Sequence, residues 1–116
     1  MGLFSKKKKD ANQDSESILK VSVSNSGKEY TFIVEGRLDT NTSPGLEEKI
    51  NEAADDAEKM IFDLGKLEYI SSAGLRVLLG AAQIMEDKGG MDVINVTQAV
   101  REVFDLTGFN RVFNIK

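Results

Sequence analysis

The chain has 116 residues, of which 41% are hydrophobic and 29% charged, and its formal net charge is −4. This length and composition are typical of one soluble globular domain with a single core. Because the sequence contains neither cysteine nor histidine, it excludes disulfides, thiolate nucleophiles, Cys/His metal sites and a Ser-His-Asp triad, and an enzyme becomes the minority interpretation.

Residues 1–16 differ in composition from the rest. Lys6–Lys9 form a basic cluster beside Leu3 and Phe4, and no apolar run of about 20 residues follows. We predict a disordered basic and polar tail, with weak contact to an anionic membrane as the alternative, and no stable membrane association. Without these lysines the body has 11 basic and 19 acidic residues, a net charge of −8 that repels phosphate backbones, so we expect no nucleic-acid partner.

A β-hairpin is predicted directly after the tail. Val21 and Val23 alternate with Ser22 and Ser24, which is the period of a half-buried strand. Gly27 can supply the turn, and residues 29–36 resume the alternation with Phe32 and Val34 on one face.

A first helix is predicted over residues 42–58, followed by a strand. Thr42 and Ser43 are suitable N-caps, and Pro44 fits the first turn, where its missing N–H costs nothing. The apolar stripe of this helix is Leu46, Ile50, Ala53, Ala54 and Ala57, with Asp55 and Asp56 on a solvated face. Residues 60–64 then predict a short strand that is buried on both faces, as in a parallel sheet.

The second half of the chain repeats this alternation. An apolar face from Leu75 predicts a second helix that stops at Gly89-Gly90, and residues 91–96 predict another buried strand. Thr97 is expected to cap a third helix that Gly108 closes, before a last strand or short extension. The order β-β-α-β-α-β-α-β favours an α/β fold: a mostly parallel sheet with an N-terminal hairpin and helices packed on it, as one domain over residues 17–116.

Two serines, Ser71 and Ser72, stand between the end of a strand and the start of the second helix. Ser71 or Ser72 could simply be an N-cap, which contributes about 1 kcal/mol. A helix N-terminus also favours anions, and the small residues Ala73 and Gly74 leave the backbone open. A phosphoserine would therefore fit here, and its charge of about −1.5 to −2 could abolish a complementary interface.

Other motifs carry less information. Residues 70–74 contain half of a G-x-S-x-G elbow but lack its first glycine and any histidine. Asp39 and Asp63 are predicted to lie near Ser72 at the strand ends, where α/β sheets place their sites. Asp39, Asp63 and the Asp55-Asp56 pair could suggest a metal, but we expect neither a metal nor a cofactor.

Three segments resemble the anti-sigma factor antagonists, the stand-alone STAS-domain proteins of bacteria. They are EGRLDTNTSPGLEEKI, IFDLGKLEYISSAGLRVLL and AVREVFDLTGFNRVFNI, and the resemblance covers about residues 18–115. The family motif is usually Asp-Ser-Ser/Thr-Gly-Leu, and Gly74-Leu75 fixes its register here. Ser72 then takes the phosphoacceptor position, Ala73 the second hydroxyl position, and Ser71 the place of the usual aspartate.

The resemblance implies a cytoplasmic partner switch that is not an enzyme and needs no cofactor. An anti-sigma factor that is also a serine kinase would phosphorylate Ser72, with Ser71 as the alternative acceptor. The unphosphorylated chain would bind this kinase and release its sigma factor, and a PP2C-type phosphatase would reverse the modification. We expect a monomer when the chain is free.

The resemblance implies a partner-binding surface with six residues: Asp39, Ser71, Ala73, Gly74, Leu75 and Arg76. Asp39 could instead cap the turn before the first helix, Arg76 could be a solvated charge, and Leu75 could belong to the core. Two other functions stay open: a STAS subunit that regulates a lipid-transport ABC ATPase complex, and a small enzyme with Asp39, Asp63 or a lysine as base. The preserved Ser72 argues against the first, and the second needs a pocket with a strongly shifted carboxylate.

Overall fold

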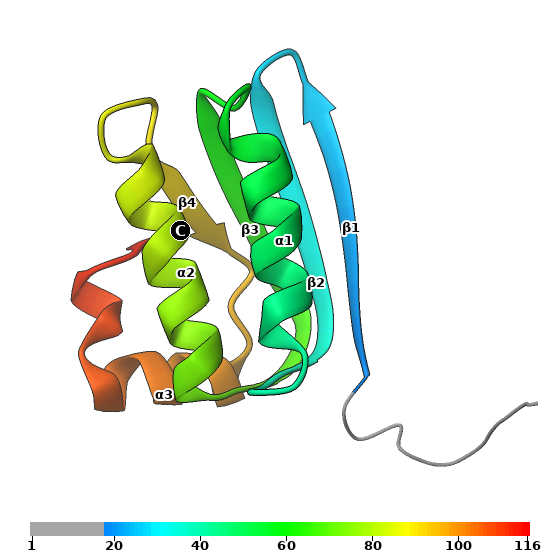
Figure 1. The fold of residues 1–116 in the computed structure, drawn as a ribbon. Coiled ribbons are helices and arrows are strands. Elements are labelled where there is room, and N and C mark those ends of the chain that lie inside the picture. Colours follow the sequence, from blue (N-terminus) through cyan, green and yellow to red (C-terminus); the bar gives the residue numbers. More distant parts are fainter. Residues whose placement is uncertain (1–17) are drawn as a thin grey trace, which may run out of the picture.

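The computed structural model describes residues 18–116, and in it five strands form one sheet in the order β1-β2-β3-β4-β5 (Figure 1). The elements are β1 (Leu19–Ser26), β2 (Glu29–Leu38), α1 (Ser43–Ala54), β3 (Lys59–Ile70), α2 (Ser72–Met85), β4 (Met91–Ile94), α3 (Gln98–Thr107), the 3-10 helix η2 (Phe109–Arg111) and β5 (Asn114–Ile115). The predicted element order and the α/β fold are confirmed. The predicted tail at residues 1–16 lies outside the described residues.

The N-terminal hairpin forms as the sequence predicts. β1 and β2 are antiparallel, with Ser26 opposite Glu29 across a two-residue turn in which Gly27 has a φ of +61°. This positive φ at the first turn position matches a type II′ turn, which suits the twist of a hairpin. The remaining pairs, β2 with β3, β3 with β4 and β4 with β5, are all parallel.

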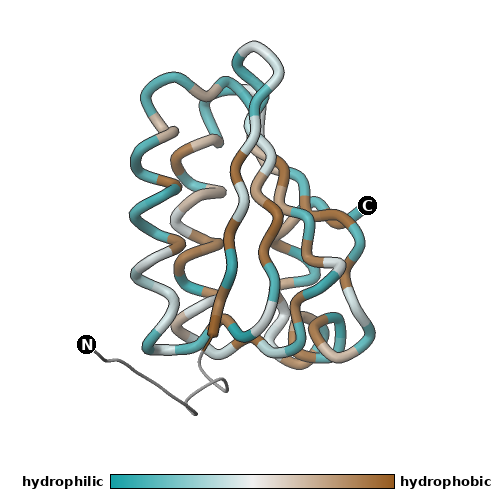
Figure 2. Tube along the Cα trace, turned by 90° about the vertical axis from the view of Figure 1, so that its right-hand side faces the viewer, coloured by the Kyte–Doolittle hydropathy of each residue, from teal (hydrophilic) through white to brown (hydrophobic). Residues whose placement is uncertain are grey.

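The hydrophobic core lies between the sheet and helices α1 and α2, which run side by side over one face (Figure 1). At its centre Phe32 of β2 stacks on Phe62 of β3, with ring centroids 4.8 Å apart. Hydrophobic segments follow the strands and the helix turns nearest to them (Figure 2). α3 lies across the end of the sheet, where the Thr97 hydroxyl donates to the carbonyl of Leu67.

The strand predicted at residues 60–64 is longer than expected and is fully buried on only one face. β3 continues through Gly65 to Ile70, so that Leu67 and Ile70 also enter the core. Its inward residues are fully buried, whereas Ile61 and Asp63 on the other face are partly exposed. The sequence prediction of burial on both faces was therefore wrong, and Asp63 lies in the middle of the strand.

Helix α1 is shorter than predicted. It ends at Ala54, so Ala57 enters the core from the following turn and not from a helical stripe. Asp55 and Asp56 are exposed as predicted, but their predicted position on a helix face is wrong, because both follow the last helical residue. Asp56 instead accepts hydrogen bonds from Lys28 at 2.9 Å and Tyr30 at 2.7 Å, which joins this turn to the hairpin.

The predicted helix caps are mostly correct. Thr97 accepts a hydrogen bond from the amide of Val100, and Gly108 closes α3 with a φ of +83°. α2 ends at Met85, four residues before Gly89, and the amide of Gly90 then bonds the carbonyl of Met85. The two glycines therefore close the turn that follows the helix.

The last strand is held by one buried carboxylate. Asp92 of β4 is 6% exposed, and it accepts a hydrogen bond of 2.6 Å from the Asn114 amide of β5. Lys59 and Lys116 place their ammonium groups 3.0 and 3.3 Å from its second oxygen. Burial alone would raise the pKa of Asp92, but the bonds from Lys59, Asn114 and Lys116 outweigh it and leave the pKa below its ordinary value.

We expect Asp92→Asn to lower the free energy of unfolding by about 1.5–3 kcal/mol at pH 7, because it removes the buried charge that Asn114, Lys59 and Lys116 contact. A depressed pKa means that Asp92 stabilises the fold above about pH 4 and loses this contribution as the pH falls further. In urea unfolding experiments, the difference in unfolding free energy between the unsubstituted chain and Asp92→Asn should therefore shrink below about pH 4. Asp105→Asn, at an exposed aspartate of α3, is the control, and an equal loss in both variants would contradict the prediction.

Candidate functional site

The candidate site forms where β2 and β3 end beside each other. Leu38 and Ile70 are partners in the parallel register, and the amide of Ser71 donates to the carbonyl of Leu38 at 2.9 Å. β2 leads into α1 and β3 into α2. Both helices therefore begin where these strands end, on the same face of the sheet (Figure 1). The first turns of the two helices therefore border one surface.

The two serines in this surface have different roles. Ser71 is the half-buried N-cap of α2, and its hydroxyl oxygen accepts a hydrogen bond from the amide of Gly74 at 3.4 Å. Ser72 is the first helical residue and is exposed. Within residues 18–116 its hydroxyl makes no hydrogen bond. Ser71 is thus the cap of α2, and Ser72 is open to solvent.

Gly74 and Leu75 hold the start of α2 against the sheet. A Cβ atom on Gly74 would lie 2.8 Å from Cγ of Leu38 and 2.9 Å from Cγ1 of Ile70, distances that are too short for real contacts. Leu75 is 3% exposed and belongs to the core. These two residues therefore fix the position of Ser72. Both are buried in the free chain, so neither is accessible to a partner.

Asp39 organises the loop between β2 and α1. One of its carboxylate oxygens accepts bonds from the amides of Asn41 at 2.9 Å and Thr42 at 3.0 Å, and it lies 3.2 Å from the Thr42 hydroxyl oxygen. Burial opposes ionisation of Asp39, but these bonds and the nearby charge of Arg37 leave its pKa below the ordinary value. Asp39 is thus a fixed negative charge in the loop that precedes α1.

The predicted capping of α1 was wrong in one respect. Thr42 does occupy the N-cap position, but its hydroxyl accepts no bond from an amide of the helix; it accepts from the amide of Asp39 and donates to the carbonyl of Arg37. The Ser43 hydroxyl likewise donates back, to the carbonyl of Asp39. Pro44 stands in the first turn as predicted.

A depression of about 200 Å³ lies between the first turns of α1 and α2. Its lining residues are Thr40, Ser43, Pro44, Glu47, Ala73, Arg76 and Val77. Ala73 and Arg76 were expected at a partner-binding surface from the sequence. The α1 side of the depression was not expected, because only the packing of α1 beside α2 brings Glu47 near Arg76. The one local feature of the sequence that marks this side is Pro44, in the first turn of α1.

Asp63 does not belong to this site. It pairs in register with Ile33 and Ile94 in the middle of the sheet, and its carboxylate accepts a bond from the amide of Gly65 at 3.0 Å. The expectation that it lies near Ser72 failed because β3 runs seven residues beyond it. Within residues 18–116, no three acidic side chains gather as a metal site, and no helix is long and apolar enough to cross a bilayer.

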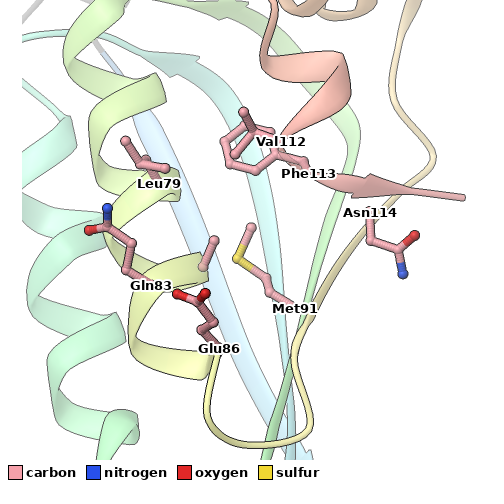
Figure 3. A pocket seen from close by; sticks show the side chains of 8 residues that line it. Leu79, Gln83, Glu86, Met91, Val112, Phe113 and Asn114 are labelled. Atoms are coloured by element: carbon pink, nitrogen blue, oxygen red, sulfur yellow. The ribbon is translucent and has the colours of Figure 1, made fainter.

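Larger hollows lie elsewhere on the molecule. One of about 420 Å³ separates α2 from the C-terminal segment, with Leu79 and Gln83 on one side and Val112 and Phe113 on the other (Figure 3). The Met91 side chain lies between these two walls (Figure 3). A further groove of about 750 Å³ lies on the opposite side of the sheet. Ser72 lines neither of these two hollows.

The sequence is similar to proteins that regulate sigma factors. The STAS-domain pattern matches residues 20–116. BtrV of Bordetella bronchiseptica, whose name describes an anti-sigma factor antagonist, is 37% identical over 84 residues, which make up 71% of this chain and 72% of BtrV. The anti-sigma-B factor antagonist of Bacillus subtilis is 24% identical over 98 residues, or 84% of this chain and 90% of that protein.

The fold is similar to solved structures of the same kind. The crystal structure of an anti-sigma factor antagonist from Mycobacterium paratuberculosis has a TM-score of 0.77 at 26% identity, and it covers 84% of this chain and 85% of its own. The unphosphorylated form of the antagonist SpoIIAA has a TM-score of 0.73 at 20% identity, over 84% and 88% of the two chains. At that identity the second likeness concerns the fold alone.

Proposed function

The chain belongs to the STAS-domain family, and on this premise we propose that it is an anti-sigma factor antagonist whose partner binding is switched by phosphorylation of Ser72. One observation carries the assignment of the acceptor. The Ser72 hydroxyl is exposed at the first position of α2, while Ser71 next to it is engaged as the cap. A kinase can therefore reach Ser72 without breaking the bond that starts the helix.

The unphosphorylated surface is suited to a protein partner. Ala73 and Arg76 lie beside Ser72 and line the depression between α1 and α2, which a partner side chain could enter. Arg76 supplies the positive charge of this surface, and Asp39 holds the adjoining loop in place through its bonds to Asn41 and Thr42. We propose that Gly74 and Leu75 act by positioning this surface and do not contact the partner.

A phosphate on Ser72 would change the charge of this surface with little disturbance to the fold. The amides of the first helical turn and the helix dipole favour an anion at this place. The added charge of about −1.5 to −2 stands next to the ionised Asp39 loop on a body that is already acidic. A partner surface that matches the neutral serine would then face a concentrated negative charge and dissociate.

The partners in this proposal are an anti-sigma factor with serine kinase activity and a PP2C-type phosphatase, in the cytoplasm. The alternative, a regulatory subunit of a lipid-transport ABC ATPase complex, does not explain an exposed serine beside a capping serine. A small enzyme is also disfavoured. Among residues 18–116, the carboxylates with shifted pKa values are Asp39, Asp56 and Asp92. All three pKa values are lowered and each carboxylate is occupied in structural bonds, so none of these three is a poised acid.

The proposal is tested by mixing the full chain with an anti-sigma factor kinase encoded in the same genome. We expect a complex in gel filtration, one added phosphate per chain in intact-mass spectra once ATP and Mg²⁺ are present, and loss of the complex by the phosphorylated chain. Treatment with a PP2C-type phosphatase should restore the binding. Copurification with a membrane ATPase, in the absence of any kinase complex, would support the alternative and overturn the proposal.

A further inference from the structure

Within residues 18–116, no strand pairs with the outer edge of β1 at any position. Among residues 18–116 β1 pairs only with β2, and it forms the outermost strand in Figure 1. Its eight residues pair with β2 in an unbroken register, without a bulge. Edge strands are usually protected by prolines, bulges or several charges, and β1, with the sequence LKVSVSNS, has only Lys20.

The hairpin turn determines which backbone groups point outward. In a two-residue hairpin the residues that flank the turn, Ser26 and Glu29, exchange hydrogen bonds, and such pairs alternate along the strands. The inward-bonded residues of β1 are therefore at even positions. The amide and carbonyl groups of Val21, Val23 and Asn25 consequently face away from β2, where a further strand could bind them.

The side chains of β1 are apolar on the face that α1 covers and polar on the other. Val23 is 42% exposed, and Val21 is only partly buried although its cross-strand partner Val34 is completely buried. Next to them a groove of about 440 Å³ separates β1 from α1, and Leu19 and Lys49 are among its lining residues. The edge thus combines free backbone groups with incompletely covered apolar side chains.

We propose that β1 is the contact surface for a second copy of this chain, with the two β1 strands antiparallel about a two-fold axis at Ser22. In this register Val21 lies opposite Val23 of the other copy, and Lys20 lies opposite Ser24 of the other copy, so no like charges meet. The outward groups of Val21 and Val23 then bond each other, which joins the two sheets into one.

A second copy fits this edge because the strand is self-complementary about Ser22. The valines at 21 and 23 pair with each other, and the single lysine at 20 pairs with a serine. Such a strand pair is smaller than the interface of a stable dimer, so the dimer is weak and forms with rising concentration. This departs from the expectation of a free monomer, and it does not depend on the function proposed for Ser72.

The absence of cysteine from the chain gives a direct test. At a pair without mutual hydrogen bonds, the two Ser22 Cα atoms would be about 4.5 Å apart, within reach of a disulfide. The full chain with Ser22→Cys should form a covalent dimer under a mild oxidant such as diamide. Ser24→Cys is the matched control: it is also exposed and on the same face, but its two copies are offset by about 13 Å along the strand.

We expect Ser22→Cys to cross-link at least tenfold faster than Ser24→Cys, and Val23→Lys in the Ser22→Cys background to remove this advantage. In sedimentation, the unsubstituted chain should shift from monomer towards dimer as its concentration rises, and Val23→Lys should stay monomeric. Equal cross-linking rates at positions 22 and 24 would indicate random collision and overturn the proposal. A monomer at every concentration would overturn it as well.

Discussion

Ser72→Ala is expected to abolish phosphate incorporation by the anti-sigma factor kinase while the complex with that kinase still forms. The substitution removes the exposed hydroxyl, and alanine is a good helix former that leaves the Ser71 cap in place. Intact-mass spectra after incubation with the kinase and ATP measure the first effect, and gel filtration of the mixture measures the second. Ser72→Asp should weaken the complex because it adds a negative charge at the same point.

Ser71→Ala is the matched control for this experiment. It removes the hydroxyl that accepts from Gly74, and loss of an N-cap lowers the free energy of unfolding by about 1 kcal/mol. Phosphorylation should continue in this variant because Ser72 remains available. If phosphate is still incorporated in Ser72→Ala but is lost in Ser71→Ala, the acceptor is Ser71 and the assignment made above is wrong.

Gly74→Ala is expected to destabilise the fold although alanine normally favours a helix. The added methyl group would lie within 2.9 Å of Leu38 and Ile70 side-chain atoms, and both of these side chains are buried and cannot easily move away. Overpacking of this kind costs about 1–3 kcal/mol, or else it pushes the first turn of α2 away from the strand ends. Urea unfolding followed by circular dichroism gives the change in free energy.

Gly80→Ala in the same helix is the control. Nothing lies within 4 Å of a Cβ atom at Gly80, so the substitution should stabilise the chain by up to about 1 kcal/mol through helix propensity. The two variants should therefore shift the unfolding midpoint in opposite directions. We also expect slower phosphorylation of Gly74→Ala under native conditions, because the turn that presents Ser72 is displaced. Equal stabilisation by both substitutions would show that Leu38 and Ile70 yield to the methyl group.

Ser71 distinguishes this chain from the aspartate usual at its position in the family motif. A serine can cap the helix as an aspartate would, and it does so here through the amide of Gly74. It contributes no charge, so the ionised Asp39 in the neighbouring loop becomes a larger part of the negative charge around Ser72. If Ser72 is phosphorylated as we propose, the electrostatic change would therefore begin from a less acidic surface.

Local patterns in the sequence were sufficient for the order of the elements. Gly27 at the turn, Pro44 in the first turn of α1 and Thr97 at the start of α3 each act on their own few residues, so no distant contact is needed to read them. The position of Ser72 at the start of α2 was predicted for the same reason.

The extent of β3 depended on its partner. The register with β2 shifts between Ile33 and Glu35 and again between Gly36 and Arg37, and such irregularities interrupt the two-residue alternation. Leu67 and Ile70 are therefore buried at a spacing that does not suggest a strand, and β2 supplies the backbone pairing that carries β3 past Gly65. This is why Asp63 was misplaced.

The sequence by itself determined the fold class and the acceptor candidate, because hydrophobic period, turn glycines and helix starts are local properties. The tertiary structure alone decided which serine caps α2, and it brought the first turn of α1, with Glu47, beside Arg76. It also left β1 without a second neighbouring strand among residues 18–116. Each of these features depends on how strands far apart in the chain pair and on where they end. A short stretch of sequence does not contain the information that sets such a long-range register.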